Sequence, residues 1–145
     1  MKKALFLFSL LCSMTLVANA QEVTESADLE TKLRYAASQH EIIKILLDDG
    51  RYDEVLPEFW EILELDLTDE HEKPVVQEAW LVGERMSEVG EYDLAHEVVD
   101  DTLDQLETSE SRFYLLMLKG KVFQDEGLTE EALEAYREAQ LYKDE

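Results

Sequence analysis

The sequence predicts an all-α protein of about six helices, arranged as three similar helix–turn–helix units. One observation is a glycine that recurs at Gly50, Gly90 and Gly127, with apolar and small residues at the same offsets around each. Another is that apolar residues recur at spacings of three and four, which is the period of a helix. No useful length of the chain alternates with the period of a strand. These observations favour a helical repeat protein.

The first unit is predicted over about residues 36–66. Its first helix follows from a run without glycine or proline, residues 26–49, in which apolar residues recur at helical spacing. Gly50 should end this helix, because glycine adopts the left-handed conformation at little cost. Asp53 is the expected N-cap of the second helix. Pro57, about one turn later, is expected to delay or bend the start of that helix.

The second unit is predicted over about residues 74–107. Pro74 suits the first position of a helix, where the missing backbone N–H costs no intrahelical hydrogen bond. That helix should end at Gly90, and Asp93 should cap the helix that follows. This unit therefore repeats the order of elements in the first.

The third unit is predicted over about residues 111–143. Ser109 or Ser111 should open its first helix, and Gly127 should end it. Thr129 and the two glutamates after it should start the last helix, since an oxygen acceptor and carboxylates satisfy free amides and complement the helix dipole.

The first twenty residues have the pattern of a secretory signal peptide. Lys2 and Lys3 form a basic region, an apolar run follows at residues 4–17, and residues 18–20 provide a small-x-small cleavage site. We therefore expect residues 1–20 to be removed and the protein to be exported, either to the periplasm or as a secreted protein.

After cleavage the chain would begin at Gln21. Residues 21–27 are expected to form a flexible lead, and residues 28–145 a single helical domain. Cys12 is the only cysteine and lies within the signal peptide. The mature chain should therefore contain neither a disulfide nor a reactive thiol.

The mature chain is strongly acidic. Its 35 acidic and 11 basic residues give a formal charge of −24, because two of the 13 basic residues lie in the signal peptide. This charge repels nucleic acid and anionic membrane surfaces, so neither is expected as a partner. It favours a basic partner, and it equally suits an exported protein that must stay soluble. No transmembrane span is expected once the signal peptide is removed.

The sequence contains no recognisable catalytic pattern. His40, His71 and His96 are far apart in the chain, without cysteine partners or the spacing of metal ligands. No nucleophile elbow or phosphate-binding glycine loop occurs. We therefore expect a protein that is not an enzyme and that has neither a metal nor a cofactor.

One predicted helix carries an acidic face. After Gly90, carboxylates recur at spacings of three and four, so they should lie along one side of the helix. They are Asp93, Glu97, Asp100, Asp104 and Glu107. This face is either a docking surface for a basic partner or divalent cations, or an ordinary solvated face.

The three units together resemble the tetratricopeptide repeat (TPR) family. That family pairs a small and an aromatic residue in the first helix of each unit with an alanine and an aromatic residue in the second. The third unit matches best, with Gly120-x-x-Phe123 before its central glycine and Ala132-x-x-x-Tyr136 after it. The residues that carry the resemblance are Gly50, Gly83, Gly90, Ala95, Gly120, Phe123, Gly127, Ala132 and Tyr136.

The resemblance implies a right-handed α-solenoid of about three TPR-like repeats, in which Gly83 and Gly120 let a neighbouring helix approach closely. In this family the first helices line a concave groove that takes an extended peptide or a helix of a partner. Alignment places eight residues on that groove: His40, Lys44, Gln77, Trp80, Glu84, Tyr114, Met117 and Lys121. Trp80 and Met117 equally suit a place in the core.

The resemblance therefore implies a protein–protein interaction module, such as a scaffold, adaptor or assembly helper, that binds a peptide or helix of a partner protein. Two alternatives stay open. Leu133 and Leu141 leave the last helix without an obvious polar cap, which suits self-association into a homo-oligomer. The acidity also suits a low-affinity cation-binding protein.

Overall fold

The computed structural model describes residues 28–65 and 67–143. These residues are helical apart from short turns and links, and they contain no strand. The predicted all-α class is therefore confirmed for this part of the chain. None of the described helices combines the length and the apolar character that a membrane span needs. The predicted signal peptide, residues 1–20, and the predicted lead, residues 21–27, lie outside the described residues.

The described residues form six α-helices, as predicted. The first covers residues 28–48. The others are α2 (Tyr52–Leu63), α3 (Glu72–Val89), α4 (Tyr92–Gln105), α5 (Ser109–Glu126) and α6 (Thr129–Ala139). Short 3-10 turns precede α3 and follow α6, namely η1 (Asp69–His71) and η2 (Gln140–Tyr142).

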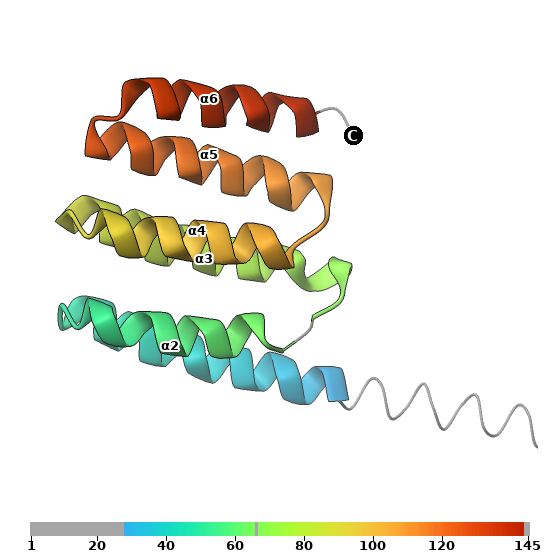
Figure 1. Ribbon diagram of the computed structural model, residues 1–145. Coiled ribbons are helices and arrows are strands. Elements are labelled where there is room, and N and C mark those ends of the chain that lie inside the picture. The colour runs from blue at the N-terminus through green and yellow to red at the C-terminus, as the bar shows by residue number, and fades with distance from the viewer. Residues whose placement is uncertain (1–27, 66, 144–145) are drawn as a thin grey trace, which may run out of the picture. The chain divides into compact units, whose positions relative to one another are not determined.

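The helices pair as antiparallel hairpins within the unit of the chain that begins at Tyr35. Turns of two or three residues join residues 35–48 to α2, α3 to α4, and α5 to α6, so each pair must run in opposite directions (Figure 1). Neighbouring hairpins pack through contacts of α3 with α5, α4 with α5, and α2 with both α3 and α4. Through α3 and α5, the first helix of the second hairpin therefore lies against the first helix of the third.

The recurring glycines end the first helix of each hairpin, as predicted. Gly50, Gly90 and Gly127 have φ values of 70°, 85° and 91°, in the left-handed region that favours glycine. The amide of the residue after each glycine donates to the carbonyl five positions back, at 2.8–2.9 Å. This pattern satisfies carbonyl groups that the end of a helix leaves free.

The predicted N-caps of α2 and α4 are wrong. These helices begin at Tyr52 and Tyr92, so Asp53 and Asp93 lie inside the first turn, and neither helix has a side-chain cap hydrogen bond. One residue separates each glycine from the next helix, so Arg51 and Glu91 take the N-cap positions. The two carboxylates still complement the positive end of the helix dipole. The predicted delay at Pro57 is also wrong, because α2 already begins five residues before it.

The starts of α3 and α5 also differ slightly from the prediction. α3 begins at Glu72, two residues before Pro74, which still lies in the first turn where a proline is tolerated. α5 begins at Ser109, and its N-cap is Thr108. The hydroxyl oxygen of Thr108 accepts the backbone amide of Ser111 at 3.3 Å. A threonine one residue upstream therefore supplies the cap expected from a serine.

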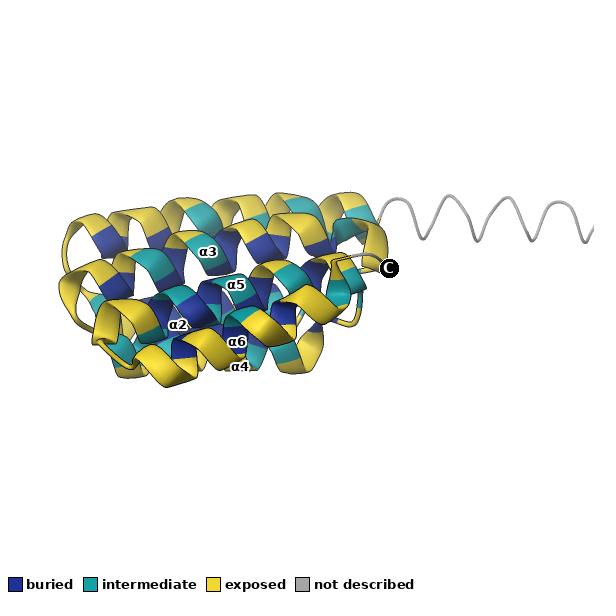
Figure 2. Cartoon of the chain, turned by 90° about the horizontal axis from the view of Figure 1, so that it is seen from above, coloured by how far each residue is buried: buried dark blue, intermediate teal, exposed yellow. Residues whose placement is uncertain are grey.

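The core lies between the hairpins, where the helices turn their apolar sides toward one another (Figure 2). Phe59 of α2, Met86 of α3 and Leu115 of α5 are fully buried there. Each comes from a different hairpin, so the hydrophobic cluster is shared by successive hairpins and no hairpin encloses it alone. Burial of such side chains stabilises the fold by about 1.5–3 kcal/mol each.

Two of the predicted small residues are confirmed as points of close approach. A methyl group at Gly120 would lie 2.5 Å from the ring of Tyr136, so α5 and α6 can meet only without a side chain there. A methyl group at Gly83 would lie 3.1 Å from a terminal carbon of Leu118. Gly83 therefore faces the first helix of the next hairpin, and Gly120 faces the second helix of its own.

Candidate functional site

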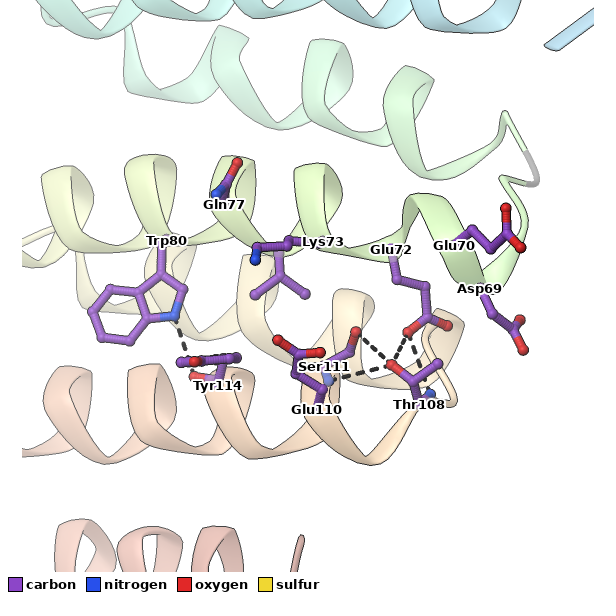
Figure 3. Close-up of a pocket in the computed structure, with 11 residues that line it drawn as sticks. Asp69, Glu70, Glu72, Lys73, Gln77, Trp80, Thr108, Glu110, Ser111 and Tyr114 are labelled. Carbon is purple, nitrogen blue, oxygen red and sulfur yellow. Dashed lines mark hydrogen bonds between the residues drawn. The ribbon is translucent and has the colours of Figure 1, made fainter. Parts of the chain in front are cut away.

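The main candidate site is a groove between α3 and α5, which we call the α3–α5 groove. Its volume is about 680 Å³. Side chains from both helices line it, with aromatic residues toward one end and acidic residues toward the other (Figure 3). It therefore offers an apolar surface and a charged surface side by side.

Trp80 and Tyr114 form the aromatic end of the α3–α5 groove. The indole Nε1 of Trp80 donates to the backbone carbonyl of Tyr114 at 3.2 Å, across from α3 to α5. Trp80 is half-buried, and Tyr114 is 45% exposed. Because the indole N–H is already hydrogen-bonded, a ligand can pack on the ring without leaving a donor unsatisfied. Trp80 is therefore neither a fully buried core residue nor a free surface residue.

The lining residues come from two rows at helical spacing. On α3, Lys73 and Gln77 are four residues apart, and Trp80 follows three residues later. On α5, Glu110 and Tyr114 are four residues apart. Residues three or four apart share one face of a helix. Each helix therefore presents one continuous face to the groove.

Three carboxylates form the acidic part of the α3–α5 groove, with Glu110 nearer the middle and Asp69 and Glu70 at the far end (Figure 3). Asp69 and Glu70 come from η1, and Glu110 comes from the first turn of α5, and all three are exposed. Within residues 28–65 and 67–143, none of them takes part in an ion pair. Lys73 is the one basic residue that lines this groove. The acidic part therefore carries negative charge that the described residues do not neutralise.

Glu72, which also lines the α3–α5 groove, is a buried carboxylate that binds the link before α5. It is 5% exposed, and its carboxylate accepts the backbone amides of Glu107 at 3.0 Å and Thr108 at 3.3 Å, together with the Thr108 hydroxyl. Burial by itself would raise the pKa of Glu72, but hydrogen bonds from Ser111, Thr108 and the two amides outweigh it and lower the pKa. This residue ties the start of α3 to the link before α5, which sets the spacing of the two helices at this end.

The eight predicted groove residues do not line one groove. Gln77, Trp80 and Tyr114 line the α3–α5 groove. Lys44 and Glu84 line a smaller hollow of about 320 Å³. Met117 lines a third hollow, of about 560 Å³, beside α5 and α6. The concave wall expected from the resemblance is thus divided into three separate hollows.

The remaining predicted groove residues are engaged in contacts between helices. His40 Nδ1 lies 2.6 Å from Oε2 of Glu78, whose other carboxylate oxygen is buried without a hydrogen-bond partner among the described residues. Lys121 donates to Asp125 at 2.6 Å, and this contact raises the pKa of Lys121. Glu84 lies 3.8 Å from Lys121. His40 and Lys121 thus contact carboxylates on α3, and Lys121 also binds a carboxylate of its own helix.

Sequence reasoning missed the acidic part of the groove and Lys73. Glu110 was overlooked because the third unit was predicted to begin at residue 111, and Asp69 and Glu70 because they were assigned to a link. The spacing from Glu110 to Tyr114 and from Lys73 to Gln77 is the pattern that could have found them. Only the packing of α3 against α5 places these two rows opposite each other.

The histidines lie in separate surroundings. His96 is held between Glu126, at 2.9 Å from Nε2, and the ring of Phe123, whose centroid is 4.4 Å away. His71 bonds to the Thr68 hydroxyl within the η1 segment. In the part of the chain that the structure describes, no group of three or more histidine, cysteine, aspartate or glutamate side chains is placed to hold a metal ion.

The predicted acidic face of α4 is present. Asp93, Glu97, Asp100 and Asp104 lie on α4 and are exposed. Glu107 was expected on the same face, but α4 ends at Gln105 and the chain is extended at Leu106, so Glu107 lies beyond the helix. The opposite side of the helix is buried, as at Ala95 and Val99. Asp100 pairs with Lys119 of α5 at 2.8 Å, so part of this face already serves contacts between helices.

The end of the helical array exposes apolar side chains on and after α6. Leu133 is 40% exposed and Leu141 is 73% exposed. The adjoining hollow of about 560 Å³ is lined by Phe113, Met117 and Tyr136. Gln140 and Lys143 also line this hollow. This edge, with its exposed leucines, is the second candidate site.

Comparisons of the chain with protein families, with curated proteins and with solved structures gave no match. The described residues offer two candidate binding surfaces: an aromatic and acidic groove between α3 and α5, and an edge with exposed leucines at α6.

Proposed function

We propose that this chain is an exported, TPR-like right-handed α-solenoid of three repeats that acts as a protein–protein interaction module. Support comes from three helical hairpins that share the same glycine turn and pack in sequence order. The close contacts at Gly83 and Gly120 also support it, because they fall at the positions that carry the resemblance. The role is proposed as scaffolding or assisting a partner protein, without catalysis.

The α3–α5 groove is the observation that carries this proposal. Its aromatic end offers rigid contact area that costs little conformational entropy to order, which is typical of residues that dominate binding interfaces. Glu70, in η1, and Trp80, in α3, are ten positions apart, which corresponds to about 15 Å at about 1.5 Å per residue. An extended peptide rises about 3.3 Å per residue, so the groove accommodates about five residues. We therefore propose that its ligand is an extended segment of a partner.

The charge of the mature chain affects how fast it associates with a partner protein. A formal charge of −24 after signal-peptide removal attracts basic surfaces and accelerates association in low salt. Export, through the predicted signal peptide, would place the partner in the periplasm or outside the cell. The partner is thus proposed to be an envelope or secreted protein.

The test is a pull-down from envelope extract with the mature chain and a Trp80→Ala/Tyr114→Ala variant. The matched control is Leu133→Ala/Leu141→Ala, which also removes two large exposed or half-exposed side chains but at the α6 edge. Circular dichroism should first establish equal helicity. We expect a partner that the wild type and the control retain and the groove variant loses. Capture of the same proteins by all three would refute binding in the groove.

The α6 edge favours a second candidate function, self-association. Apolar side chains at the end of a helical array need a cover, which a second copy of the chain can supply. Sedimentation should then give a mass that rises with concentration in the wild type and stays monomeric in Leu133→Ala/Leu141→Ala. A monomeric wild type at high concentration would remove this candidate.

A further inference from the structure

We propose that the segment bound in the α3–α5 groove is basic: an apolar side chain packs on Trp80 and Tyr114, and a lysine or arginine side chain binds the carboxylates of Asp69, Glu70 and Glu110. This inference rests on the proposed function and names the chemical class of its ligand. It concerns the charge of one groove, not the general acidity of the chain.

The first argument is the local charge. Four carboxylates line the α3–α5 groove, at Asp69, Glu70, Glu72 and Glu110, against one lysine, at Lys73. Glu72 is occupied by hydrogen bonds from the chain itself. The other three have no ion pair within the described residues. A cation in the groove would therefore gain charge-assisted hydrogen bonds without displacing an existing partner.

The second argument is that the two lysines of α5 already pair with carboxylates of the chain. Lys119 pairs with Asp100 at 2.8 Å, and Lys121 pairs with Asp125 at 2.6 Å. These two lysines of α5 are thus directed to contacts outside the groove, and Arg112, the third basic residue of α5, does not line it. An acidic ligand segment would meet this surplus of carboxylates and be repelled.

The third argument is the separation of the aromatic end from the acidic part. Glu110 lies four residues before Tyr114 on α5, about 6 Å along the helix. Glu70 lies ten residues before Trp80, about 15 Å along the chain. At about 3.3 Å per residue, an extended ligand covers these distances with about two to five residues. The ligand should therefore carry its basic residue two to five positions from its apolar residue.

Selection of peptides from a random phage-displayed library tests the composition of the ligand. The mature chain is the bait, and each selected peptide is then measured by titration against wild type and Trp80→Ala/Tyr114→Ala. We expect enriched peptides that combine an apolar residue with lysine or arginine at the stated spacing and that bind the groove variant weakly. Enriched peptides that require the aromatic pair but lack basic residues would overturn the charge inference and leave the groove function intact. Enriched peptides that bind both proteins equally, or no enrichment, would overturn both.

A charge variant tests the site of the basic residue. Glu70→Gln/Glu110→Gln should weaken the selected peptides about fivefold, since each partly exposed ion pair contributes modestly. Glu97→Gln/Asp104→Asn is the matched control, because it removes two exposed charges from the acidic face of α4 and changes the net charge equally. The control should change affinity less than twofold. Equal weakening by both variants would show a general field effect and refute a site at the groove.

Discussion

Gly120→Ala offers the sharpest test of how α5 and α6 are held together. The added methyl group would lie 2.5, 2.6 and 2.8 Å from three ring carbons of Tyr136, closer than real side-chain carbons approach. The ring is held in place because its hydroxyl donates to Gln124 Oε1 at 3.1 Å. Tyr136 must therefore rotate away, or the two helices must separate, when alanine replaces glycine.

Two opposing effects determine the magnitude. Overpacking of a closely packed site costs about 1–3 kcal/mol. Alanine in the interior of a helix is favoured over glycine by about 1 kcal/mol. We therefore expect Gly120→Ala to lower the free energy of unfolding by about 1 kcal/mol. Urea unfolding followed by circular dichroism at 222 nm measures this difference.

A double variant separates the two effects. When Tyr136→Ala has already removed the ring, the methyl group at Gly120 meets no obstacle from it, and only the gain in helix propensity remains. Gly120→Ala should then stabilise the protein by about 1 kcal/mol, so its effect changes sign. The reasoning would be refuted if Gly120→Ala stabilised the wild type as much as it stabilised Tyr136→Ala. Gly83→Ala is a milder control, because the flexible end of Leu118 can yield at 3.1 Å.

Three further predictions concern single contacts. Glu72→Gln should destabilise the protein at pH 7 by about 1–3 kcal/mol, because a glutamine amide cannot accept the two backbone amides as the carboxylate does; urea unfolding measures the loss. Gly90→Ala should cost about 1–2 kcal/mol, because φ of 85° strains any residue with a Cβ atom, and thermal unfolding measures it. Trp60→Phe should cost about 1 kcal/mol through loss of the 2.7 Å hydrogen bond from Nε1 to Asp101, also seen in urea unfolding.

The pH dependence of the Glu72 prediction follows from the direction of its pKa shift. The folded state lowers the pKa of Glu72, so the carboxylate adds stability above its unfolded pKa of about 4.3. That contribution is lost as the pH falls through the lower folded pKa. The difference between wild type and Glu72→Gln should therefore shrink between pH 7 and pH 3. A difference in stability that stays constant over this range would contradict the lowered pKa of Glu72. If Gly90→Ala or Trp60→Phe were as stable as the wild type, the effect predicted for that variant would be refuted.

Much of the helical architecture could be predicted from local sequence. Gly50, Gly90 and Gly127 end helices because their backbone conformation is a property of the residue itself. The spacing of buried residues on α4 likewise follows from the helical period. The N-cap predictions at Asp53 and Asp93 failed because a cap depends on where the preceding turn finishes, and the tight glycine turn moves the N-cap two residues earlier, to Arg51 and Glu91.

The sequence by itself determined the helices, the glycine turns that end the first helix of each hairpin, and the faces that the helices bury, because these depend on interactions between residues a few positions apart. Only the tertiary structure decided which predicted groove residues share a hollow. It placed Trp80 beside Tyr114, set Glu84 near Lys121, and put Glu110 in one groove with the carboxylates of η1. The physical reason is that side chains on two helices meet according to how the helices pack, and that packing depends on contacts between residues far apart in the chain, such as Gly83 with Leu118.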